Sequence, residues 1–258
     1  MCTLHIVHFS ILLAFNHVTY NCKGLQQKDK RLKIFSYIKD KLKSNGLVFL
    51  QETHSSPLDV EKWTREWDGD LIFSHGSSNS KGVLIGFTKD VNANIDKIAC
   101  DQHGRVLIID ITTNSQKYVL INFYNANIER DQISAIKSLN DLIDIHGVDD
   151  DRHVIFSGDF NVIFDVGTDA LGGSPSLKTK SLATLINLLE KLDVGDIFRI
   201  RNPIKKRFTF RRKTRNNTVI HRRLDYIFLS NSLQEYANKI EVLPSMLSDH
   251  SSFSVFKR

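Results

Sequence analysis

The chain has 258 residues, of which 41% are hydrophobic and 25% are charged. These values are ordinary for a globular protein with a large core, so they exclude an intrinsically disordered chain. The formal net charge is +6, yet residues 199–223 hold eleven Lys or Arg and no Asp or Glu. Such a basic stretch favours a polyanionic partner such as nucleic acid, because binding releases counterions from phosphates. A solvated, charged hairpin is the alternative.

The three cysteines form no C-x-x-C pair, so they indicate neither a disulfide framework nor a zinc site and fit a reducing, intracellular compartment. Residues 1–16 contain an apolar run that no Lys or Arg precedes and that is shorter than the roughly 20 residues needed to span a bilayer. We therefore expect an N-terminal extension of uncertain structure at 1–16, a single domain at 17–258, and no membrane partner. A secreted protein is the alternative, weakly supported by the glycosylation-type triplet at Asn216.

In chain order, residues 28–44 predict the first helix, because Leu32, Phe35, Ile38 and Leu42 recur at helical spacing before Asn45-Gly46. Further helices are predicted at 130–145 and 178–192. Runs rich in Val, Ile, Phe and Tyr predict strands, and the Gly-rich stretch 165–181 predicts a long surface loop. The predicted strands are 47–51, 71–74, 82–88, 105–111, 117–124, 153–158, 207–212, 218–229, 239–243 and 252–256.

Several of these runs are apolar nearly throughout, as in residues 106–109, which indicates strands covered on both faces. Strands interspersed with only a few helices favour an α/β fold in which two sheets pack face to face and helices lie outside. The predicted architecture is a two-sheet β-sandwich core flanked by helices, a four-layer α/β sandwich.

Acids and amides follow two of the apolar strands. Glu52 comes directly after the strand that ends at residue 51, and Asp159 follows 153–158 with Asn161 two residues on. We expect Gly158 to allow a sharp exit from the strand, so that Asp159 projects into a site and Asn161 offers an amide N–H to a phosphoryl oxygen. Taken alone, Glu52 is more consistent with a surface acid, and an Asx turn at the strand end is the less favoured alternative for Asp159. Together they fit the hydrolysis of a phosphoester, in which carboxylates hold a hard metal ion and activate water.

Near the end of the sequence, Ser248-Asp249-His250 adds a histidine that can bind phosphate as an imidazolium. Asp225 is expected in the middle of a strand and facing the core, where a histidine partner would compensate its charge. For His250 alone, a structural hydrogen bond is the alternative.

Taken together, the motifs resemble those of the endonuclease/exonuclease/phosphatase superfamily, over about residues 17–256. The resemblance implies a metal-dependent hydrolase of phosphodiesters or phosphomonoesters that uses Mg²⁺, with Mn²⁺ as a substitute. It also implies that Glu52, Asn21 and Asp249 lie at the metal. Tyr124 and Asn161 would contact the phosphate, Asp159 would orient or deprotonate the water, and His250, paired with Asp225, would bind the phosphate. The motifs are Asn21–Leu25, Gln51–His54, Asn122–Asn127, Ser157–Asn161, Arg223–Tyr226 and Ser248–His250.

Within the superfamily, the chain is most similar to the endonuclease domains of non-LTR retrotransposons, LINE elements of the L1 and Tx1 kind. The similarity lies in residues 49–54, 194–203 and 208–210. It implies nicking of one strand of double-stranded DNA, in the nucleus, to leave a 3′-hydroxyl and a 5′-phosphate, without an obligate protein partner. It also implies that Thr209 lies near the scissile phosphate and that a basic hairpin enters a DNA groove. The residues expected to contact DNA are Thr209, Arg211, Arg212, Lys213, Arg215 and Arg223.

The chain departs from the superfamily pattern at two places. The usual Tyr-Ala-Pro-Asn is replaced by Tyr124-Asn125-Ala126-Asn127, which removes a proline that would stiffen the loop. His221-Arg222 stand where abasic-site nucleases have Gly-Trp, which disfavours abasic-site specificity. A phosphatase or phosphodiesterase of the same superfamily and a catalytically silent, nucleic-acid-binding remnant of a mobile element are the alternative functions.

Overall fold

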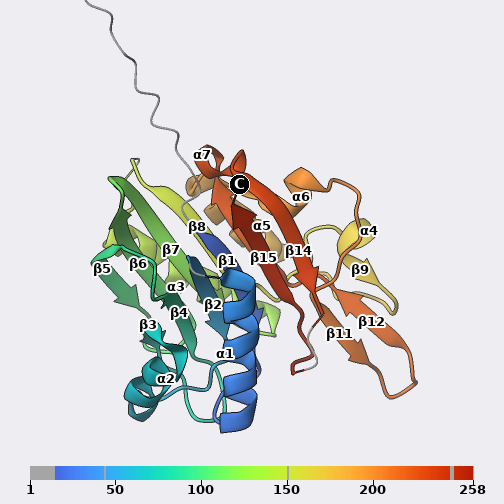
Figure 1. The fold of residues 1–258 in the computed structure, drawn as a ribbon. Coiled ribbons are helices and arrows are strands. Elements are labelled where there is room, and N and C mark those ends of the chain that lie inside the picture. Colours follow the sequence, from blue (N-terminus) through green and yellow to red (C-terminus); the bar gives the residue numbers. More distant parts are fainter. Residues whose placement is uncertain (1–14, 44, 150, 245–246, 258) are drawn as a thin grey trace, which may run out of the picture.

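The computed structural model describes residues 15–43, 45–149, 151–244 and 247–257. Two six-stranded sheets pack face to face at its centre (Figure 1), in the orders β14-β15-β1-β2-β4-β3 and β10-β13-β8-β7-β6-β5. The strands of the first sheet are β1 (Asn16–Asn21), β2 (Gly46–Gln51), β3 (Gly69–Ser74), β4 (Val83–Thr88), β14 (Ala237–Leu243) and β15 (Ser252–Lys257). Those of the second are β5 (Asn94–Cys100), β6 (Val106–Thr113), β7 (Gln116–Tyr124), β8 (His153–Asp159), β10 (Val194–Asp196) and β13 (Asp225–Ser230).

Helices cover the outer face of each sheet. The apolar faces of α1 (Lys28–Leu42) and α2 (Val60–Trp67) pack on the first sheet, and those of α3 (Glu129–His146) and α5 (Thr179–Lys191) pack on the second. The predicted four-layer α/β sandwich is therefore confirmed. No helix in the described residues combines the length and apolar character needed to cross a membrane. Shorter helices are η1 (Pro57–Asp59), α4 (Val166–Asp169), α6 (Ile197–Arg201) and α7 (Asn231–Gln234).

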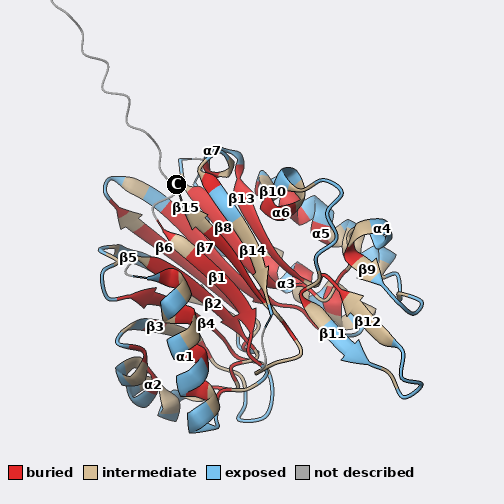
Figure 2. Cartoon of the chain, turned by 45° about the vertical axis from the view of Figure 1, so that its right-hand side comes forward, coloured by how far each residue is buried: buried red, intermediate tan, exposed pale blue. Residues whose placement is uncertain are grey.

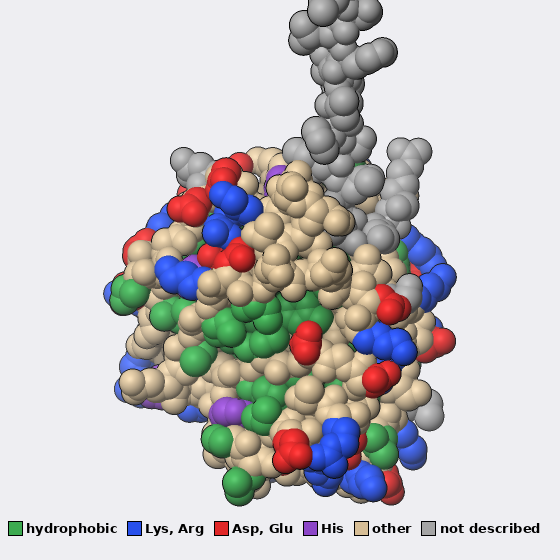
Figure 3. Space-filling model, turned by 60° about the vertical axis from the view of Figure 1, so that its left-hand side comes forward, with side chains coloured by type: hydrophobic (Ala, Val, Ile, Leu, Met, Phe, Trp, Pro, Cys, Tyr) green, Lys and Arg blue, Asp and Glu red, His purple; other side chains and the backbone are tan. Residues whose placement is uncertain are grey.

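The main apolar core lies between the two sheets, where side chains such as Phe49, Ile85 and Ile109 are fully buried. Figure 2 shows the central strands as almost wholly buried. Strand β3 is an edge strand of the first sheet and β5 is an edge strand of the second. Ile95 and Ile98 of β5 are 42% and 50% exposed. On the face in Figure 3, which brings the left-hand side of Figure 1 forward, apolar side chains gather in a band.

A third, three-stranded sheet lies beside the sandwich and has the order β11-β12-β9. Its strands are β9 (Ala170–Leu171), β11 (Phe210–Lys213) and β12 (Val219–Arg222). The β11–β12 hairpin projects from the body of the molecule (Figure 1). At its base, Phe210 pairs with His250 through an isolated antiparallel bridge, and the N–H of Arg211 donates to the carbonyl of Asp249 at 3.0 Å.

Several sequence predictions need correction. The predicted loop 165–181 contains α4, β9 and the start of α5, and the predicted strand 218–229 divides into β12 and β13, which belong to different sheets. Helix α2 was not predicted because only two tryptophans mark its inner face, and β5 was missed because it is mostly exposed and polar.

Three of the four core residues predicted for the first helix, Phe35, Ile38 and Leu42, are buried, and the fourth, Leu32, is not. Leu32 is 37% exposed, and Arg31 lies inside instead, because its guanidinium donates to both carboxylate oxygens of Glu66 at 2.6 and 2.9 Å. At the N-terminal side, Phe15 is buried and β1 begins at Asn16. Residues 1–14 of the predicted extension lie outside the described residues.

Candidate active site

The candidate residues lie along one rim of the sandwich, at strand ends contributed by both sheets. Strands β1 and β2 run parallel, as do β7 and β8, so the residues at their carboxyl ends meet at the same edge. Asn21 ends β1, Glu52 follows β2, Tyr124 ends β7 and Asp159 ends β8. Asp225 begins β13 directly opposite Asp159 in the antiparallel register.

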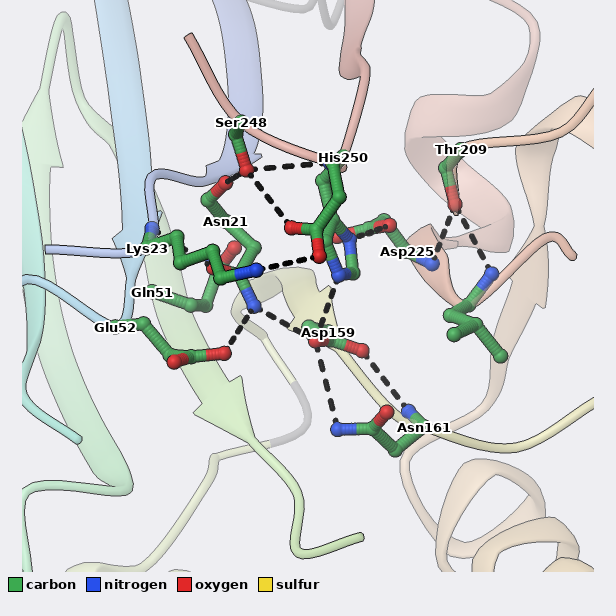
Figure 4. Close-up of polar contacts among 12 residues, drawn as sticks. Asn21, Lys23, Gln51, Glu52, Asp159, Asn161, Thr209, Asp225, Ser248 and His250 are labelled. Carbon is green, nitrogen blue, oxygen red and sulfur yellow. Dashed lines mark hydrogen bonds and ion pairs between the residues drawn. The ribbon is translucent and has the colours of Figure 1, made fainter. Parts of the chain in front are cut away.

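Asn21 joins the two sheets at this rim. Its amide nitrogen donates to Glu52 Oε1 at 2.8 Å and to Asp159 Oδ2 at 2.9 Å (Figure 4). Its amide oxygen accepts the backbone N–H of Lys23 at 3.1 Å, which fixes the orientation of the amide. One buried side chain thus holds carboxylates from β2 and β8 next to each other.

His250 forms a buried ion pair with Asp225, with 2.8 Å between Nδ1 and the carboxylate, and its Nε2 lies 3.8 Å from Asp159 Oδ2. Burial alone would lower the pKa of His250, but the carboxylates of Asp225 and Asp159 raise this pKa to about 10. The ring is therefore an imidazolium at neutral pH, with Nε2 directed toward the rim. A fixed positive charge of this kind suits an anionic oxygen.

The protonation of the other two groups also follows from their surroundings. Burial and the nearby Asp225 carboxylate raise the pKa of Asp159, and His250 and Asn21 oppose this rise. Such a carboxylate is a better proton acceptor at neutral pH than an exposed one. Burial and the charges of Glu52 and Asp159 raise the pKa of the Tyr124 phenol, so this phenol keeps its proton and can donate a hydrogen bond.

Asn161 adopts a left-handed backbone (φ 51°) and its N–H donates to Asp159 Oδ1 at 3.0 Å.

The prediction that Gly158 allows a sharp exit from the strand was wrong. Gly158 lies within β8 and makes no sharp exit; a Cβ there would come within 1.9 Å of the carbonyl oxygen of Phe123. The glycine therefore permits the close approach of β7 to β8.

The Ser248–His250 segment is tied to β1 and to the loop that follows. Ser248 Oγ donates to the carbonyl of Asn21 at 2.9 Å and accepts the N–H of His250 at 3.1 Å. Asp249 forms an ion pair of 2.7 Å with Lys23. Both Glu52 and Asp249 are partly exposed, at 24% and 32% of their side-chain area, so solvent reaches them.

The donor chemistry of the rim fits a divalent cation. Hard ions prefer carboxylate and amide oxygens, which Glu52, Asp249 and the second lone pair of Asn21 Oδ1 supply. A tighter cluster also exists, because single ligand atoms of Asp159, Asp225 and His250 lie within 4.8 Å of one another. An imidazolium has no lone pair for a metal, so Glu52 and Asp249 are better suited than His250 to hold a cation.

Two of the residues expected on DNA have other surroundings. Arg223 is 1% exposed and donates to Asp169 at 2.8 Å and to Asp196 at 2.6 Å. Its charge is therefore neutralised by buried carboxylates of the protein itself. Thr209 is fully buried, and its hydroxyl accepts the N–H groups of Leu224 at 3.0 Å and Asp225 at 3.1 Å. It supports the backbone that carries Asp225. The other expected residues, Arg211, Arg212, Lys213 and Arg215, are exposed on the hairpin.

Three residues near the site were given no role from the sequence. The His54 ring lies 3.7 Å from Glu52, Lys178 Nζ donates to the carbonyl of Asn161 at 2.8 Å, and Lys23 contacts Asp249. Lys23 and His54 stand inside the recognised motifs, so the sequence carried a signal for them. Lys178 had none, because it reaches Asn161 from the predicted loop.

A sequence profile of the Endonuclease/Exonuclease/phosphatase family matches residues 18–250. The "Transposon TX1 uncharacterized 149 kDa protein" of Xenopus laevis is 26% identical over 243 residues, which cover 94% of this chain and 18% of that protein. The chain thus spans less than a fifth of the length of this relative.

Two solved structures show the same fold. One is the AP endonuclease LMAP from Leishmania major, with a TM-score of 0.72 and 18% identity, covering 95% of this chain and 87% of that one. The other is the endonuclease domain of TRAS1, a telomere-specific non-LTR retrotransposon, with a TM-score of 0.63 and 14% identity, covering 95% and 98%. At these identities the likeness concerns the fold alone.

Proposed function

The chain belongs to the endonuclease/exonuclease/phosphatase family, and we propose that it is a metal-dependent endonuclease that nicks one strand of double-stranded DNA. The nick would leave a 3′-hydroxyl and a 5′-phosphate, as target-primed retrotransposition requires. The observation that carries this proposal is the meeting of Asn21, Glu52, Asp159 and the Asp225–His250 pair at a rim flanked by an exposed basic hairpin. A DNA substrate implies action in the nucleus.

In this mechanism Asp159 accepts the proton of a water that attacks the phosphorus, the bond from phosphorus to the 3′ oxygen breaks, and the departing 3′ oxygen takes a proton from solvent at the open rim. The imidazolium of His250 binds a non-bridging oxygen as negative charge develops there, and Asp225 keeps the ring charged and oriented. The Tyr124 phenol and the Asn161 side chain would add hydrogen bonds to the same phosphate. When bound at Glu52, Asn21 and Asp249, a divalent ion, Mg²⁺ or Mn²⁺, supplies Lewis-acid charge to phosphate oxygens.

The hairpin supports a DNA substrate over a small phosphorylated molecule. Arg211, Arg212, Lys213 and Arg215 are exposed on a projecting element (Figure 2), and such charges gain affinity from a long phosphate backbone. The related transposon protein and the retrotransposon endonuclease fold agree with this choice.

The test is conversion of supercoiled plasmid to open circles by the purified protein with Mg²⁺ or Mn²⁺. The substitutions Glu52→Ala, Asp159→Ala and His250→Ala should each lower the nicking rate by about a hundredfold or more, whereas the exposed Glu61→Ala should not change it. Polymerase extension from the nick would report the 3′-hydroxyl. Full nicking by the three variants would contradict the proposal, as would release of phosphate from 3′-phosphorylated oligonucleotides without any nick.

A further inference from the structure

Lys23 is a charged group at the rim that the proposed mechanism does not use. It lies between β1 and α1 with a left-handed backbone (φ 49°). Its N–H donates to Asn21 Oδ1 at 3.1 Å and its carbonyl accepts a hydrogen bond from Lys30 Nζ at 2.7 Å. Because both polar groups of the Lys23 backbone are hydrogen-bonded, the backbone conformation that directs the side chain is fixed.

The side chain of Lys23 extends over the active site. Figure 4 shows it running past Asn21 and Glu52 toward the side that carries His250. Its ammonium ends 2.7 Å from Asp249 Oδ2, and the side chain is 57% exposed. The ammonium therefore neutralises one of the two accessible carboxylates that we assign to the divalent ion.

An ion pair with this exposure contributes at most a small stabilisation, so a divalent cation at Asp249 can replace the ammonium at little cost. The released ammonium remains attached to a fixed loop beside the place where His250 and Asp159 would hold a phosphate. A lysine is a compact positive charge that suits a phosphate oxygen.

We propose that Lys23 is a substrate-binding residue with two alternative partners. Without the divalent ion it pairs with Asp249, and with the ion bound it contacts a phosphate oxygen of the DNA at the nicked position. This inference rests on the proposed endonuclease function. It has two consequences, that Lys23 contributes one phosphate contact and that it competes with the metal ion.

Both consequences can be measured without catalysis, using Lys23→Met with Lys23→Arg as the charge-retaining variant. DNA affinity would be measured by fluorescence anisotropy over a range of salt concentrations, with Ca²⁺ replacing Mg²⁺. Lys23→Met should bind DNA about fivefold more weakly at low salt, and its plot of log affinity against log salt should be shallower by about 0.9, the value for one phosphate contact. Lys23→Arg should keep the unsubstituted slope.

Metal affinity would be measured by Mn²⁺ titration followed by electron paramagnetic resonance, without DNA. Lys23→Met should bind Mn²⁺ about fivefold more tightly, because Asp249 no longer has a competing cation. Lys137→Met, on the exposed face of α3, is the matched control and should change neither quantity. An unchanged salt slope or an unchanged Mn²⁺ affinity in Lys23→Met would overturn the inference. If the unsubstituted protein still nicks plasmid, that result leaves the proposed function standing.

Discussion

The charge states of His250 and His17 show how far neighbouring groups decide what a histidine does. His250 is buried between two carboxylates, which hold its proton. His17 is equally enclosed but lies in the apolar core beside Phe49, and burial lowers its pKa to about 3. The same residue type is therefore cationic at the rim and neutral in the core, and each state has a measurable consequence.

Asp225→Asn should remove the main cause of the raised pKa of His250. Only the carboxylates of Asp159 and Asp249 then oppose burial, so we expect the pKa of the ring to fall and a larger fraction of the imidazole to be neutral at pH 8. Nicking at pH 8 should drop by at least about tenfold, and the deficit should shrink as the pH is lowered toward 6. The ring would be followed by NMR titration, with the exposed Asp70→Asn as a control. A pKa of His250 that does not fall in Asp225→Asn would contradict the assignment.

His17→Leu should alter how stability depends on pH. Neither ring nitrogen of His17 has a hydrogen-bond partner among the described residues. Below pH 6.5 the unfolded chain binds a proton at this residue that the folded protein refuses until about pH 3, so the free energy of unfolding falls as the pH falls through that window. The slope from one such group approaches about 1.4 kcal/mol per pH unit. Urea denaturation at pH 7, 5.5 and 4.5 should show that the free energy of unfolding of His17→Leu, relative to that of the unsubstituted protein, increases as the pH falls. A difference between the two proteins that does not change with pH would refute this.

At the scale of residues, the sequence predicted which residues meet, and the resemblance implied the pairing of His250 with Asp225, but the partners of Arg223 were not predicted. Glu52 and Asp159 follow predicted strands, and Asn21 and His250 stand in the recognised motifs, so their meeting at a rim could be expected. Arg223 looks like its basic neighbours in the sequence. Its partners Asp169 and Asp196 are distant along the chain, so the residues around Arg223 in the sequence do not show that it is buried.

The β11–β12 hairpin is the element that we propose to contact DNA, and ion pairs hold the segments at its base. Asp169 is fully buried at the end of α4 and accepts from Arg199 at 2.5 Å and from Arg223 at 2.8 Å. Breaking such a buried pair on one side typically costs about 3–5 kcal/mol. This network explains why residues 218–229 are not one strand, since the chain turns inward at Arg223 before β13 begins.

Replacing Arg211, Arg212, Lys213 and Arg215 with Gln should weaken DNA binding without affecting the metal site. The salt dependence of log affinity should become shallower by up to about 0.9 for each charge that contacts a phosphate, and Mn²⁺ affinity should stay the same. The matched control replaces four exposed lysines on the helices with Gln: Lys28, Lys33, Lys62 and Lys137. If both sets change the slope equally, the hairpin has no special part in binding.

Across the whole molecule, the site depends on two sheets keeping one relative position, because each contributes part of it. Asn122 of β7 fixes that position: its amide nitrogen donates to the carbonyls of Leu50 at 3.0 Å and Leu84 at 2.7 Å, and its oxygen accepts Gln51 Nε2 at 2.8 Å. The layered architecture followed from the spacing of strands and helices in the sequence. The hydrogen bonds between the sheets did not, because Gln51 and Asn122 stand inside recognised motifs but nothing in the sequence shows that their amides meet.

Asn122→Leu should destabilise the protein by about 3 kcal/mol, because it leaves buried groups of the first sheet without hydrogen bonds. Urea denaturation would measure this, and the exposed Asn94→Leu on β5 should stay within about 0.5 kcal/mol of the unsubstituted protein. Nicking by the folded Asn122→Leu protein should also fall, because the two sheets that position Glu52 and Asp159 lose hydrogen bonds that hold them in one relative position. If Asn122→Leu is as stable as Asn94→Leu, the hydrogen bonds of Asn122 do not hold the two sheets together.

The bridge between Phe210 and His250 bears on how chimeras of this protein should be built. The N–H of Arg211 donates to the carbonyl of Asp249, and the N–H of Ser251 donates to the carbonyl of Thr209 at 2.6 Å. Backbone hydrogen bonds therefore join the base of the β11–β12 hairpin to the segment that carries His250. A hairpin transplanted from a relative would therefore disturb His250 unless both of the paired segments are exchanged together. The natural unit of exchange is residues 209–223 combined with 249–251, two stretches that an alignment alone would never join.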